Sequence, residues 1–331
     1  MEKAVVAGAG FAGIQAAFSL ARKGYNVEII DRSEKHVFRP GLIDLVRRTG
    51  KEKIQVDLEK LFEDSSVDFF QEEITSINPE EKTVEAGRTH EYDYLVLALG
   101  GEPIIPEGLE EANIPYTTEE ASKLGEMDGS AAIIGAGYTG LEYGFELSEK
   151  GLDVSVFEAE TRPLPGFSRK VSEKVLDSLH GKLKFRGGKH IFSVKDGRIE
   201  FEEGEENFDH VIVCIGVKRN SLIDRCFEDF RVNSGLCCVQ YPDIFAVGDS
   251  SYVNRNTAHN AIIEGRKVAE NIDRDESQEL EPIDVEQPGF LLSAGKTGLY
   301  IRGDRVFKSR IFRYVKDAVR KLYFFRLRKK A

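Results

Sequence analysis

The feature that most constrains this chain is a glycine-rich unit that occurs twice. Each copy consists of a short apolar stretch, the pattern GxGxxG, a helix-forming stretch, and a second apolar stretch that ends in an acidic residue. The copies span residues 4–31 and 131–158, and 23 positions separate the first glycine from the acid in both of them. Internal repeats set the architecture of a chain, so we expect two similar α/β units.

The glycines of such a unit have separate physical tasks. The first permits a tight turn between strand and helix, the second lets a pyrophosphate approach the backbone, and the third lets the helix pack closely on the strand. The phosphates bind to free N–H groups at the positive end of the helix, and the acid accepts hydrogen bonds from ribose hydroxyls. Two such units predict two dinucleotides, most simply FAD and a nicotinamide nucleotide. The less favoured alternative is two chance glycine turns in an ordinary doubly wound sheet.

The rest of each half follows a common plan of a hairpin and then a closing strand. These segments are residues 67–77, 82–86 and 94–99 in the first half, and residues 182–185, 190–195, 198–202 and 210–215 in the second. The pattern predicts an α/β fold of two Rossmann-like, doubly wound, three-layer domains with β-meander insertions, followed by a short amphipathic region. We expect a discontinuous FAD-binding domain (1–105 and 235–285), an NAD(P)H-binding domain (106–234) and a C-terminal region (286–331).

Composition and charge exclude several classes of protein. The hydrophobic content of 41% and the charged content of 31% are ordinary for a soluble globular protein. The net charge of -11 argues against nucleic acid as the main partner. The four cysteines form no CxxC or CxxxxC pattern, which excludes a redox dithiol of the glutathione-reductase kind and a zinc site. Neither a signal sequence nor a run of about 20 apolar residues is present, so we expect a cytoplasmic location.

The C-terminal segment, residues 307–331, differs from the rest of the chain in charge. It contains ten Lys/Arg residues and one Asp, and five of its apolar residues fall at helical spacing. These five are Ile311, Val315, Ala318, Leu322 and Phe325. A basic amphipathic helix of this kind is typical of an anchor on an anionic membrane surface. Two alternatives stay open, because the helix could instead close a homodimer or pack on its own domain.

Several polar residues are candidates for binding or chemistry. Asp249 ends a buried strand, where its carboxylate can accept a hydrogen bond from a ribityl hydroxyl. His36 is interpreted either as an acid–base group or, as we favour, as a loop histidine bonded to the backbone. Glu158, the acid of the second unit, favours NADH because a carboxylate repels a 2′-phosphate. Arg162 lies close enough in sequence to weaken that preference.

Five segments together resemble the flavoprotein disulfide-reductase superfamily without its disulfide, and within it the type II NADH:quinone oxidoreductases. Two lie early in the chain: the first glycine unit with Asp31-Arg32, and HVFRPGL (36–42), which is similar to the family's HLFxPLL loop beside the flavin. The others are TGLE (139–142), FAVGD (245–249) and AHNAIIEG (258–265), which are similar to the family's TGVE segment, late GD motif and AQxAxxQG helix. His259 and Glu264 replace the two glutamines of that helix.

The resemblance implies that NADH, or NADPH, reduces FAD by hydride transfer and that FAD then passes two electrons to a membrane quinone. Glu142, near the start of the second unit's helix, is implied in proton transfer near the flavin, with favourable charge at the helix N-terminus as the alternative. His259 is implied as a second catalytic residue, and no metal is expected. The enzyme is expected on the inner face of the cell membrane.

The resemblance also implies two sets of binding residues. The FAD set is Gly8, Gly10, Phe11, Ala12, Gly13, Asp31, Arg32, Phe38, Arg39, Pro40, Ala98, Gly100, Gly248, Asp249, Ala258 and His259. The NADH set is Gly135, Gly137, Tyr138, Thr139, Gly140, Glu158 and Gly216. The alternatives are a soluble NAD(P)H-dependent reductase of a protein or small molecule, a sulfide:quinone reductase-like enzyme, and an NADH-sensing flavoprotein.

Overall fold

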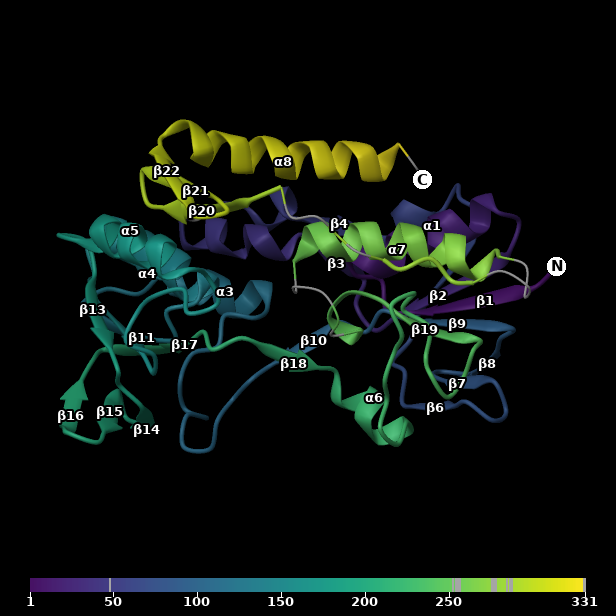
Figure 1. The fold of residues 1–331 in the computed structure, drawn as a ribbon, viewed down its shortest axis with the longest axis horizontal. Helices are drawn as coiled ribbons and strands as arrows, with labels where there is room; N and C mark the ends of the chain where they lie inside the picture. Colours follow the sequence, from purple (N-terminus) through teal and green to yellow (C-terminus); the bar gives the residue numbers. More distant parts are fainter. Residues whose placement is uncertain are drawn as a thin grey trace.

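Two parallel β-sheets, one from each glycine-rich unit, form the two halves of the molecule (Figure 1). The computed structural model describes residues 1–47, 49–251, 253, 257–274, 279–283, 285 and 288–329. Glu286, predicted to begin the C-terminal region, and Lys330 and Ala331 of the predicted basic segment lie outside the described residues.

The first sheet carries the first glycine-rich unit. Within the described residues it has five parallel strands in the order β19-β9-β1-β2-β5. Their bounds are β1 (Lys3–Ala7), β2 (Asn26–Asp31), β5 (Val67–Gln71), β9 (Tyr94–Leu97) and β19 (Ile244–Ala246). Helices α1 (Phe11–Arg22) and α7 (Ala258–Ile272) lie together on one face (Figure 1). Because β19 and α7 come late in the chain, segments that are distant in sequence complete this half.

The second sheet repeats the arrangement with the second unit. Its described strands are parallel, in the order β13-β12-β11-β17. Their bounds are β11 (Ser130–Ile134), β12 (Asp153–Glu158), β13 (Lys184–Gly187) and β17 (His210–Val213), and the helices on one face are α4 (Tyr138–Glu149) and α5 (Arg169–Leu179). Ile133 pairs with Val156 here as Val6 pairs with Ile29 in the first sheet. The two units therefore match in strand register.

Neighbouring residues of the central strands belong to separate cores. In β1, Val6 packs with α1 and α7, whereas Val5 belongs to the core on the opposite face with α6 (Ser221–Cys226). In β11, Ile133 packs with α4 and α5, whereas Ala132 belongs to the core under the second meander. Successive side chains of a strand point to opposite faces. Each sheet is thus covered on both faces, which confirms the predicted three-layer fold.

A small antiparallel meander lies in each half, as predicted. The strands are β6 (Ser76–Asn78), β7 (Thr83–Glu85) and β8 (Thr89–Glu91) in the first, and β14 (Ile191–Lys195), β15 (Arg198–Phe201) and β16 (Gly204–Asn207) in the second. The start of each predicted hairpin was wrong in the same way. β5 and β13 instead extend the parallel sheets, pairing with β2 and β12, while β6 at the end of the predicted segment 67–77 does pair with β7. Hydrophobic periodicity does not distinguish a parallel edge strand from a hairpin arm.

Short segments connect the two halves, and further short elements lie between the longer strands and helices. β10 (Gly101–Pro103) and β18 (Val217–Arg219) follow the closing strands of the two units and pair with each other. The other short elements are β3 (Lys35–Val37), β4 (Gln55–Asp57), the 3₁₀ helices η1 (Arg39–Arg47), η2 (Lys51–Lys53) and η3 (Gly248–Ser250), and the helices α2 (Leu58–Phe62) and α3 (Thr118–Leu124). The two nucleotide units are therefore joined directly by the paired β10 and β18.

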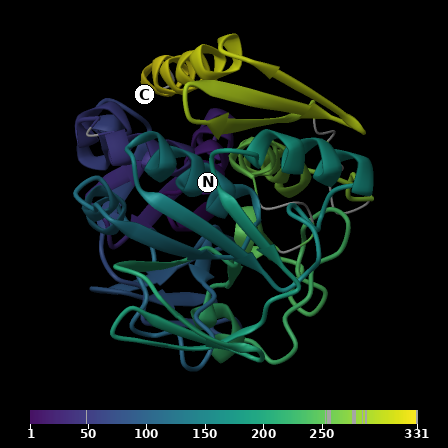
Figure 2. The same ribbon diagram turned by 90° about the vertical axis from the view of Figure 1, so that its left-hand side faces the viewer.

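The C-terminal region forms a layer across the top of both halves (Figure 2). It consists of β20 (Phe290–Ala294), β21 (Thr297–Arg302), β22 (Arg305–Ser309) and α8 (Ile311–Arg328). Phe324 and Leu327 of α8 are buried in the core of the first half, and Lys316 pairs with Glu142 of the second. None of the described helices is long and apolar enough to cross a membrane.

Candidate functional site

The first glycine loop has a shape that only glycine permits. Gly8 has a φ of +107°, and a Cβ atom there would lie 2.4 Å from the carbonyl oxygen of Ala98. A Cβ atom on Gly13 would lie 1.9 Å from the carbonyl oxygen of Gly8. Asp31 holds the loop, because its Oδ2 accepts a hydrogen bond of 2.7 Å from the Ala9 N–H. Burial raises the pKa of this carboxyl, and hydrogen bonds from the Ser33 and Ala9 N–H groups oppose the rise.

The second glycine loop reproduces these contacts. Gly135 has a φ of +104°, and its Cβ would lie 2.5 Å from the carbonyl oxygen of Cys214. A Cβ on Gly140 would lie 2.0 Å from the carbonyl oxygen of Gly135. Glu158 Oε2 accepts a 2.8 Å hydrogen bond from the Ala136 N–H. The two predicted nucleotide loops therefore have one geometry, down to the acid that holds each of them.

Both loops present a helix N-terminus with N–H groups that no described side chain caps. α1 begins after Gly10 and α4 after Gly137, and neither glycine can supply a capping oxygen. By contrast, Thr117, Ser168 and Thr257 cap α3, α5 and α7 through their side chains. The uncapped helix ends are those to which the dinucleotide motif assigns phosphates. The residues of both loops therefore fit a bound dinucleotide.

Residues predicted to hold the flavin come from distant segments and meet around η3. Arg39 donates a 3.2 Å hydrogen bond to the carbonyl oxygen of Tyr116 and lies 4.0 Å from the centre of that ring. Burial raises the pKa of Asp249, and the positive charge of Arg39 opposes this effect. The Gly100 N–H donates to Ser250 Oγ at 3.1 Å. The loops after β9 and β19 are thus bonded to each other beside Arg39.

Helix α7 fixes the position of the Gly248 turn. Glu264 is buried, and its Oε2 accepts a 2.6 Å hydrogen bond from the Gly248 N–H. A Cβ on Gly265 would lie 2.1 Å from the carbonyl oxygen of Ala12, so α7 lies directly against the start of α1. His259 is exposed in the first turn of α7. Ala12, Gly248 and the start of α7 are therefore brought together as the prediction requires.

His36 is buried beside the first loop and is bonded on both sides of its ring. Its Nδ1 lies 3.1 Å from the carbonyl oxygen of Ala9, and its Nε2 lies 2.8 Å from the hydroxyl of Tyr323. Because a carbonyl only accepts, Nδ1 carries the hydrogen and Nε2 accepts from Tyr323. Burial lowers the pKa of His36 to about 4. The predicted backbone bond of His36 is confirmed, but the predicted loop is wrong, because His36 lies in β3.

The His36–Tyr323 bond belongs to an aromatic cluster that joins α8 to the flavin side. The Phe11 ring centre lies 5.0 Å from that of His36, 5.6 Å from that of Phe38 and 5.2 Å from that of Tyr323. Phe324 of α8 packs on Phe38 at 6.0 Å. Aromatic pairs at these distances stabilise a contact beyond their buried area. Phe11 and Phe38, both in the predicted FAD set, therefore pack against the C-terminal helix.

Glu142 lies on α4 under the C-terminal layer, where two partners bind it. Its Oε1 accepts a 2.6 Å hydrogen bond from the Ser293 N–H and forms an ion pair of 2.6 Å with Lys316 of α8. The carboxylate is buried. The proton-transfer role stays a prediction, and the ion pair adds a structural role that the sequence interpretation did not include.

The remaining predicted residues keep their expected places. Ala98, Gly100 and Gly216 follow the closing strands of the two units, Pro40 lies in η1, Ala258 begins α7, and Tyr138 and Thr139 begin α4. Arg32 is exposed and pairs with Glu73 at 3.4 Å. Residues that the sequence interpretation missed are Tyr116, Ser250, Lys316, Arg320 and Tyr323. These five lie outside the recognised motifs or next to one, so only the fold reveals their partners.

Comparison with known proteins agrees with this geometry. The family model for pyridine nucleotide-disulphide oxidoreductase matches residues 2–265. The type II NADH:quinone oxidoreductase of Staphylococcus aureus is 25% identical, with 86% of each chain covered. The structure of NDH2 from Plasmodium falciparum in complex with NADH superposes with a TM-score of 0.85 at 14% identity, covering 99% of this chain and 98% of that one. The sulfide:quinone oxidoreductase of Aquifex aeolicus gives 0.84 at 19% identity, covering 100% and 92%.

Proposed function

The chain belongs to the pyridine nucleotide-disulphide oxidoreductase family, and from this premise we propose that it is an NADH:quinone oxidoreductase. The family assignment supports FAD and NADH as its cofactors. The proposed overall reaction is NADH + H⁺ + quinone → NAD⁺ + quinol, in which two electrons pass from the nicotinamide to the quinone. The observation that carries the proposal is the pair of matching, uncapped glycine loops in one chain.

The two units have separate tasks in this proposal. FAD, when bound, supplies the ability to accept a hydride and to release electrons to an acceptor. The loop at Gly8–Gly13, with Asp31 and the segment around Asp249, holds it. The domain division at residues 105, 234 and 285 stays a proposal, and α6, which it assigns to the second domain, packs in the core of the first sheet. The loop at Gly135–Gly140, with Glu158, holds NADH. Each loop orients its dinucleotide through backbone N–H groups and one acid.

Preference for NADH over NADPH rests on Glu158. Its carboxylate lies at the end of β12 and holds the loop through the Ala136 N–H. Arg162, which could attract a 2′-phosphate, instead donates to Phe167 O at 2.8 Å, Pro165 O at 2.8 Å and Ser172 Oγ at 2.7 Å. Its guanidinium is therefore engaged within its own segment. We expect Glu158 to repel the 2′-phosphate without opposition from Arg162.

Proton supply is the proposed task of Glu142 and His259. The overall reaction takes up one proton from solution, and a general acid must reach the acceptor to deliver it. His259 is exposed at the start of α7, so it can exchange protons with water. Glu142, paired with Lys316 under the C-terminal layer, is the second group proposed to pass the proton on. Both assignments stay proposals.

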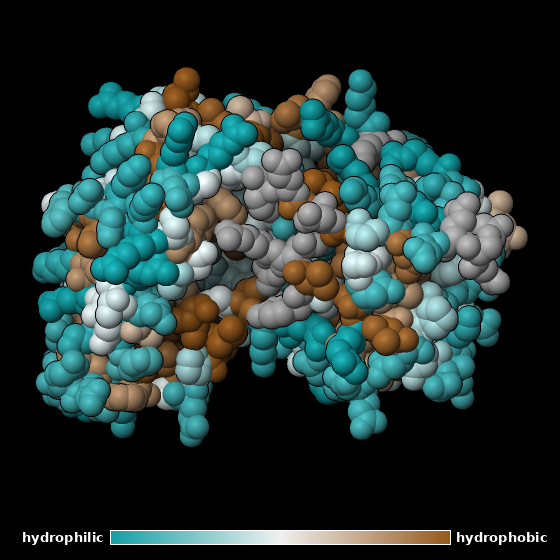
Figure 3. All heavy atoms as spheres, in the orientation of Figure 1, coloured by the Kyte–Doolittle hydropathy of each residue, from teal (hydrophilic) through white to brown (hydrophobic). Residues whose placement is uncertain are grey.

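The acceptor is proposed to arrive from a membrane on which α8 lies. Phe312, Tyr323 and Phe324 of α8 pack on the protein, while the predicted apolar stripe points outward. Ile311 is 60% exposed and Phe325 is 63% exposed, with Val315, Val319 and Leu322 exposed between them. Figure 3 shows hydrophobic side chains along the upper edge of the molecule, where α8 lies. Basic residues flank this stripe along α8. Such a surface suits the headgroup–acyl boundary of an anionic membrane, here the inner face of the cell membrane.

A sulfide:quinone reductase needs reactive thiols, and the cysteines do not favour that alternative. All four cysteines lie within the described residues and are free thiols. Burial raises the pKa of Cys214 to about 12 and that of Cys237 to about 11. A thiol reacts as its thiolate, and a raised pKa removes the thiolate at neutral pH. The proposed quinone reduction therefore uses the two bound nucleotides and no thiol.

Anaerobic stopped-flow measurements test the reaction. The FAD-loaded protein is reduced with NADH and then mixed with a soluble short-chain quinone, while the absorbance of oxidised flavin is followed. Rapid reduction and rapid reoxidation by the quinone are expected. Rapid reduction without reoxidation by quinone would contradict the proposal and point to a protein acceptor.

Vesicle sedimentation tests the membrane association separately. The variant Ile311→Gln/Val315→Gln/Leu322→Gln removes exposed apolar side chains from α8, and we expect it to lose binding to vesicles that contain anionic lipid. Phe192→Gln/Val239→Gln changes exposed apolar residues elsewhere and serves as the control. Equal binding of both variants, together with a dimer that only the α8 variant dissociates, would assign the stripe to a homodimer.

A further inference from the structure

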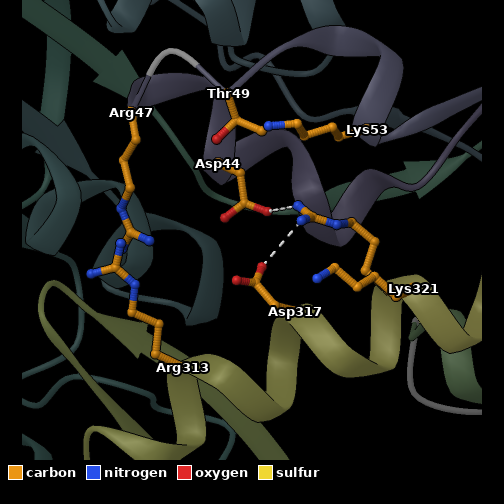
Figure 4. A pocket seen from close by; sticks show the side chains of 8 residues that line it. Asp44, Arg47, Thr49, Lys53, Arg313, Asp317 and Lys321 are labelled. Carbon is orange, nitrogen blue, oxygen red and sulfur yellow. Dashed lines mark hydrogen bonds and ion pairs between the residues drawn. The ribbon is translucent and has the colours of Figure 1, made fainter.

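A charged cavity lies between η1 and α8, apart from the predicted nucleotide residues (Figure 4). Its volume is about 330 Å³, and the charged residues that line it include Asp44, Arg47, Lys53, Arg313, Arg320 and Lys321. Asp317 and Thr49 complete the lining. Five of these side chains are cationic and two are acidic. Pockets for small ligands begin at about 300 Å³, so the cavity can receive a compact anionic group.

The two acids share one counter-ion within the cavity, so Arg320, Asp44 and Asp317 together carry one negative charge. Arg320 is buried and forms ion pairs with both Asp44 and Asp317, the second at 3.2 Å (Figure 4). Arg47 pairs outside the cavity with Glu146. Within the described part of the chain, Lys53, Arg313 and Lys321 have no acidic partner, since Arg313 donates only to the carbonyl oxygen of Gly295 at 3.1 Å. Three cations are thus available to an anion.

Like charges are also crowded at one end of this cavity. Figure 4 shows the guanidinium groups of Arg47 and Arg313 pointing toward each other, one from η1 and the other from α8. Burial lowers the pKa of Arg47 to about 10, and the charge of Arg313 adds to this effect. Arg47 uses Nε and Nη2 to bind Glu146, which leaves its Nη1 and the guanidinium of Arg313 for an anion between the two groups. Guanidinium groups bind phosphate oxygens in a bidentate manner, so a phosphate is the anion that suits this pair.

The position of the cavity on α8 indicates where the phosphate comes from. Arg313, Arg320 and Lys321 line the cavity, and the outward apolar stripe of the same helix includes Val315 and Leu322. A helix that lies in a membrane interface has its apolar face at the level of the acyl boundary and its flanks among the headgroups. A cavity on the flank of such a helix is therefore at the depth of lipid phosphates.

We propose that the cavity between η1 and α8 binds the phosphate group of an anionic membrane lipid. The inference rests on the membrane association proposed above. Binding of one lipid there would join η1, which carries the predicted flavin residues Arg39 and Pro40, to the helix that faces the membrane. The lipid would thereby fix the orientation of the enzyme on the surface.

The test uses the FAD-loaded full chain and dihexanoyl phosphatidylglycerol, a soluble lipid, below its micelle concentration. Isothermal titration is expected to show one site per chain. In Lys53→Gln/Lys321→Gln the affinity should fall about 30-fold, from about 1 kcal/mol for each basic residue near an anionic headgroup. Both lysines are exposed and have no described ion-pair partner, so the fold should be retained, and flavin content checks this. Lys308→Gln/Lys329→Gln removes the same charge outside the cavity and should keep the wild-type affinity.

Three outcomes decide the proposal. A single site that the cavity variant loses and the control keeps supports it. Equal losses in both variants, or no saturable binding, would overturn it and leave only diffuse attraction of the basic helix to anionic surfaces. Inorganic phosphate that binds as tightly as the lipid would overturn the lipid source and assign the cavity to free phosphate. These titrations need neither a quinone nor a vesicle, so their failure is distinguishable from failure of the proposed function.

Discussion

The two glycine-rich units have the same loops, but different parts of the chain lie over their helices. In the first unit α7 packs against α1, and Arg266 donates a 3.1 Å hydrogen bond to Gln15. In the second unit β20 and α8 lie over α4, and Lys316 pairs with Glu142. Gln15 and Glu142 occupy equivalent positions of the two repeats. An equivalent position thus has a neutral amide bonded to an arginine in one unit and a buried carboxylate paired with a lysine in the other.

The different segments that lie over the two loops suit their proposed tasks, which are to hold FAD in the first unit and to bind NADH in the second. Around the first loop, α7 and the Tyr323 side of α8 enclose the binding residues through Gly265, His36 and Phe11. Around the second loop, Tyr138 at the position of Phe11 packs on Phe290 of β20 at 6.4 Å, and Pro163 is present at the position of His36. A cofactor that stays bound benefits from enclosure, whereas a substrate such as NADH must enter and leave in each cycle. The same local motif can therefore serve either task, depending on what covers it.

The largest expected effect comes from adding one methyl group to either loop. In Gly13→Ala the new Cβ would lie 1.9 Å from the Gly8 carbonyl oxygen, and in Gly140→Ala it would lie 2.0 Å from that of Gly135. Overpacking costs about 1–3 kcal/mol, which corresponds to about 5- to 150-fold in affinity. Gly13→Ala should lose bound FAD, measured by flavin absorbance. Gly140→Ala should keep FAD but need about 5- to 150-fold more NADH for half-maximal reduction rate.

The matched control is Gly166→Ala, where no described atom lies within 4 Å of the new Cβ and no positive φ is required. It should keep both flavin content and the NADH dependence. If Gly140→Ala also lost FAD, the two loops could not have separate ligands. The comparison between a cofactor unit and a substrate unit would then be wrong.

The sequence predicted the loops but not what covers them. Gly8, Gly13 and Asp31 act through backbone contacts within one βαβ unit, so their spacing alone is sufficient to identify the turn. The partners of Glu142 and His36, which are Lys316 and Tyr323, lie 174 and 287 positions away along the chain. No local pattern encodes such pairs. The basic helix was likewise predicted, but only the structure separates its buried residues, such as Phe324, from its exposed stripe.

Among effects on stability rather than on ligand binding, the largest is expected from the unequal covering of the two helices. Lys316→Met leaves the buried Glu142 without its counter-ion, and breaking a buried pair costs about 3–5 kcal/mol. Arg266→Met removes a hydrogen bond from a charged guanidinium to the neutral Gln15 and should cost less, about 1.5–3 kcal/mol. The free energies of unfolding, measured by denaturant titration, give both values. Glu142→Gln/Lys316→Met should recover most of the loss, because it leaves no unpaired charge.

The same variants separate the two roles of Glu142. If the double variant recovers stability but reoxidation by quinone stays slow, Glu142 has a role in proton transfer beyond its ion pair. If the reaction recovers together with stability, the structural role is sufficient. Equal costs for Lys316→Met and Arg266→Met would show that α4 and α1 are covered in energetically similar ways, contrary to the comparison.

The smallest of these effects concerns His36, a feature that the first unit does not share with the second. Five positions after the acid the first unit has His36 and the second has Pro163. In the folded protein burial lowers the pKa of His36 from 6.5 to about 4. Between these values the unfolded chain binds a proton that the folded chain does not. The contribution of neutral His36 to the free energy of unfolding is therefore fully present above pH 6.5, and it falls as the pH decreases toward 4.

At pH 5 the expected loss is about 2 kcal/mol, from about 1.4 kcal/mol per pH unit below the unfolded pKa. His36→Gln can still donate to the Ala9 carbonyl and accept from Tyr323, but it cannot titrate. Denaturant titrations at pH 7 and pH 5 should show that the wild type loses about 2 kcal/mol more than the variant does. An identical loss in both would mean that protonation of His36 does not weaken the first unit. The contact of His36 with the glycine loop and with α8 would then not make the free energy of unfolding depend on pH.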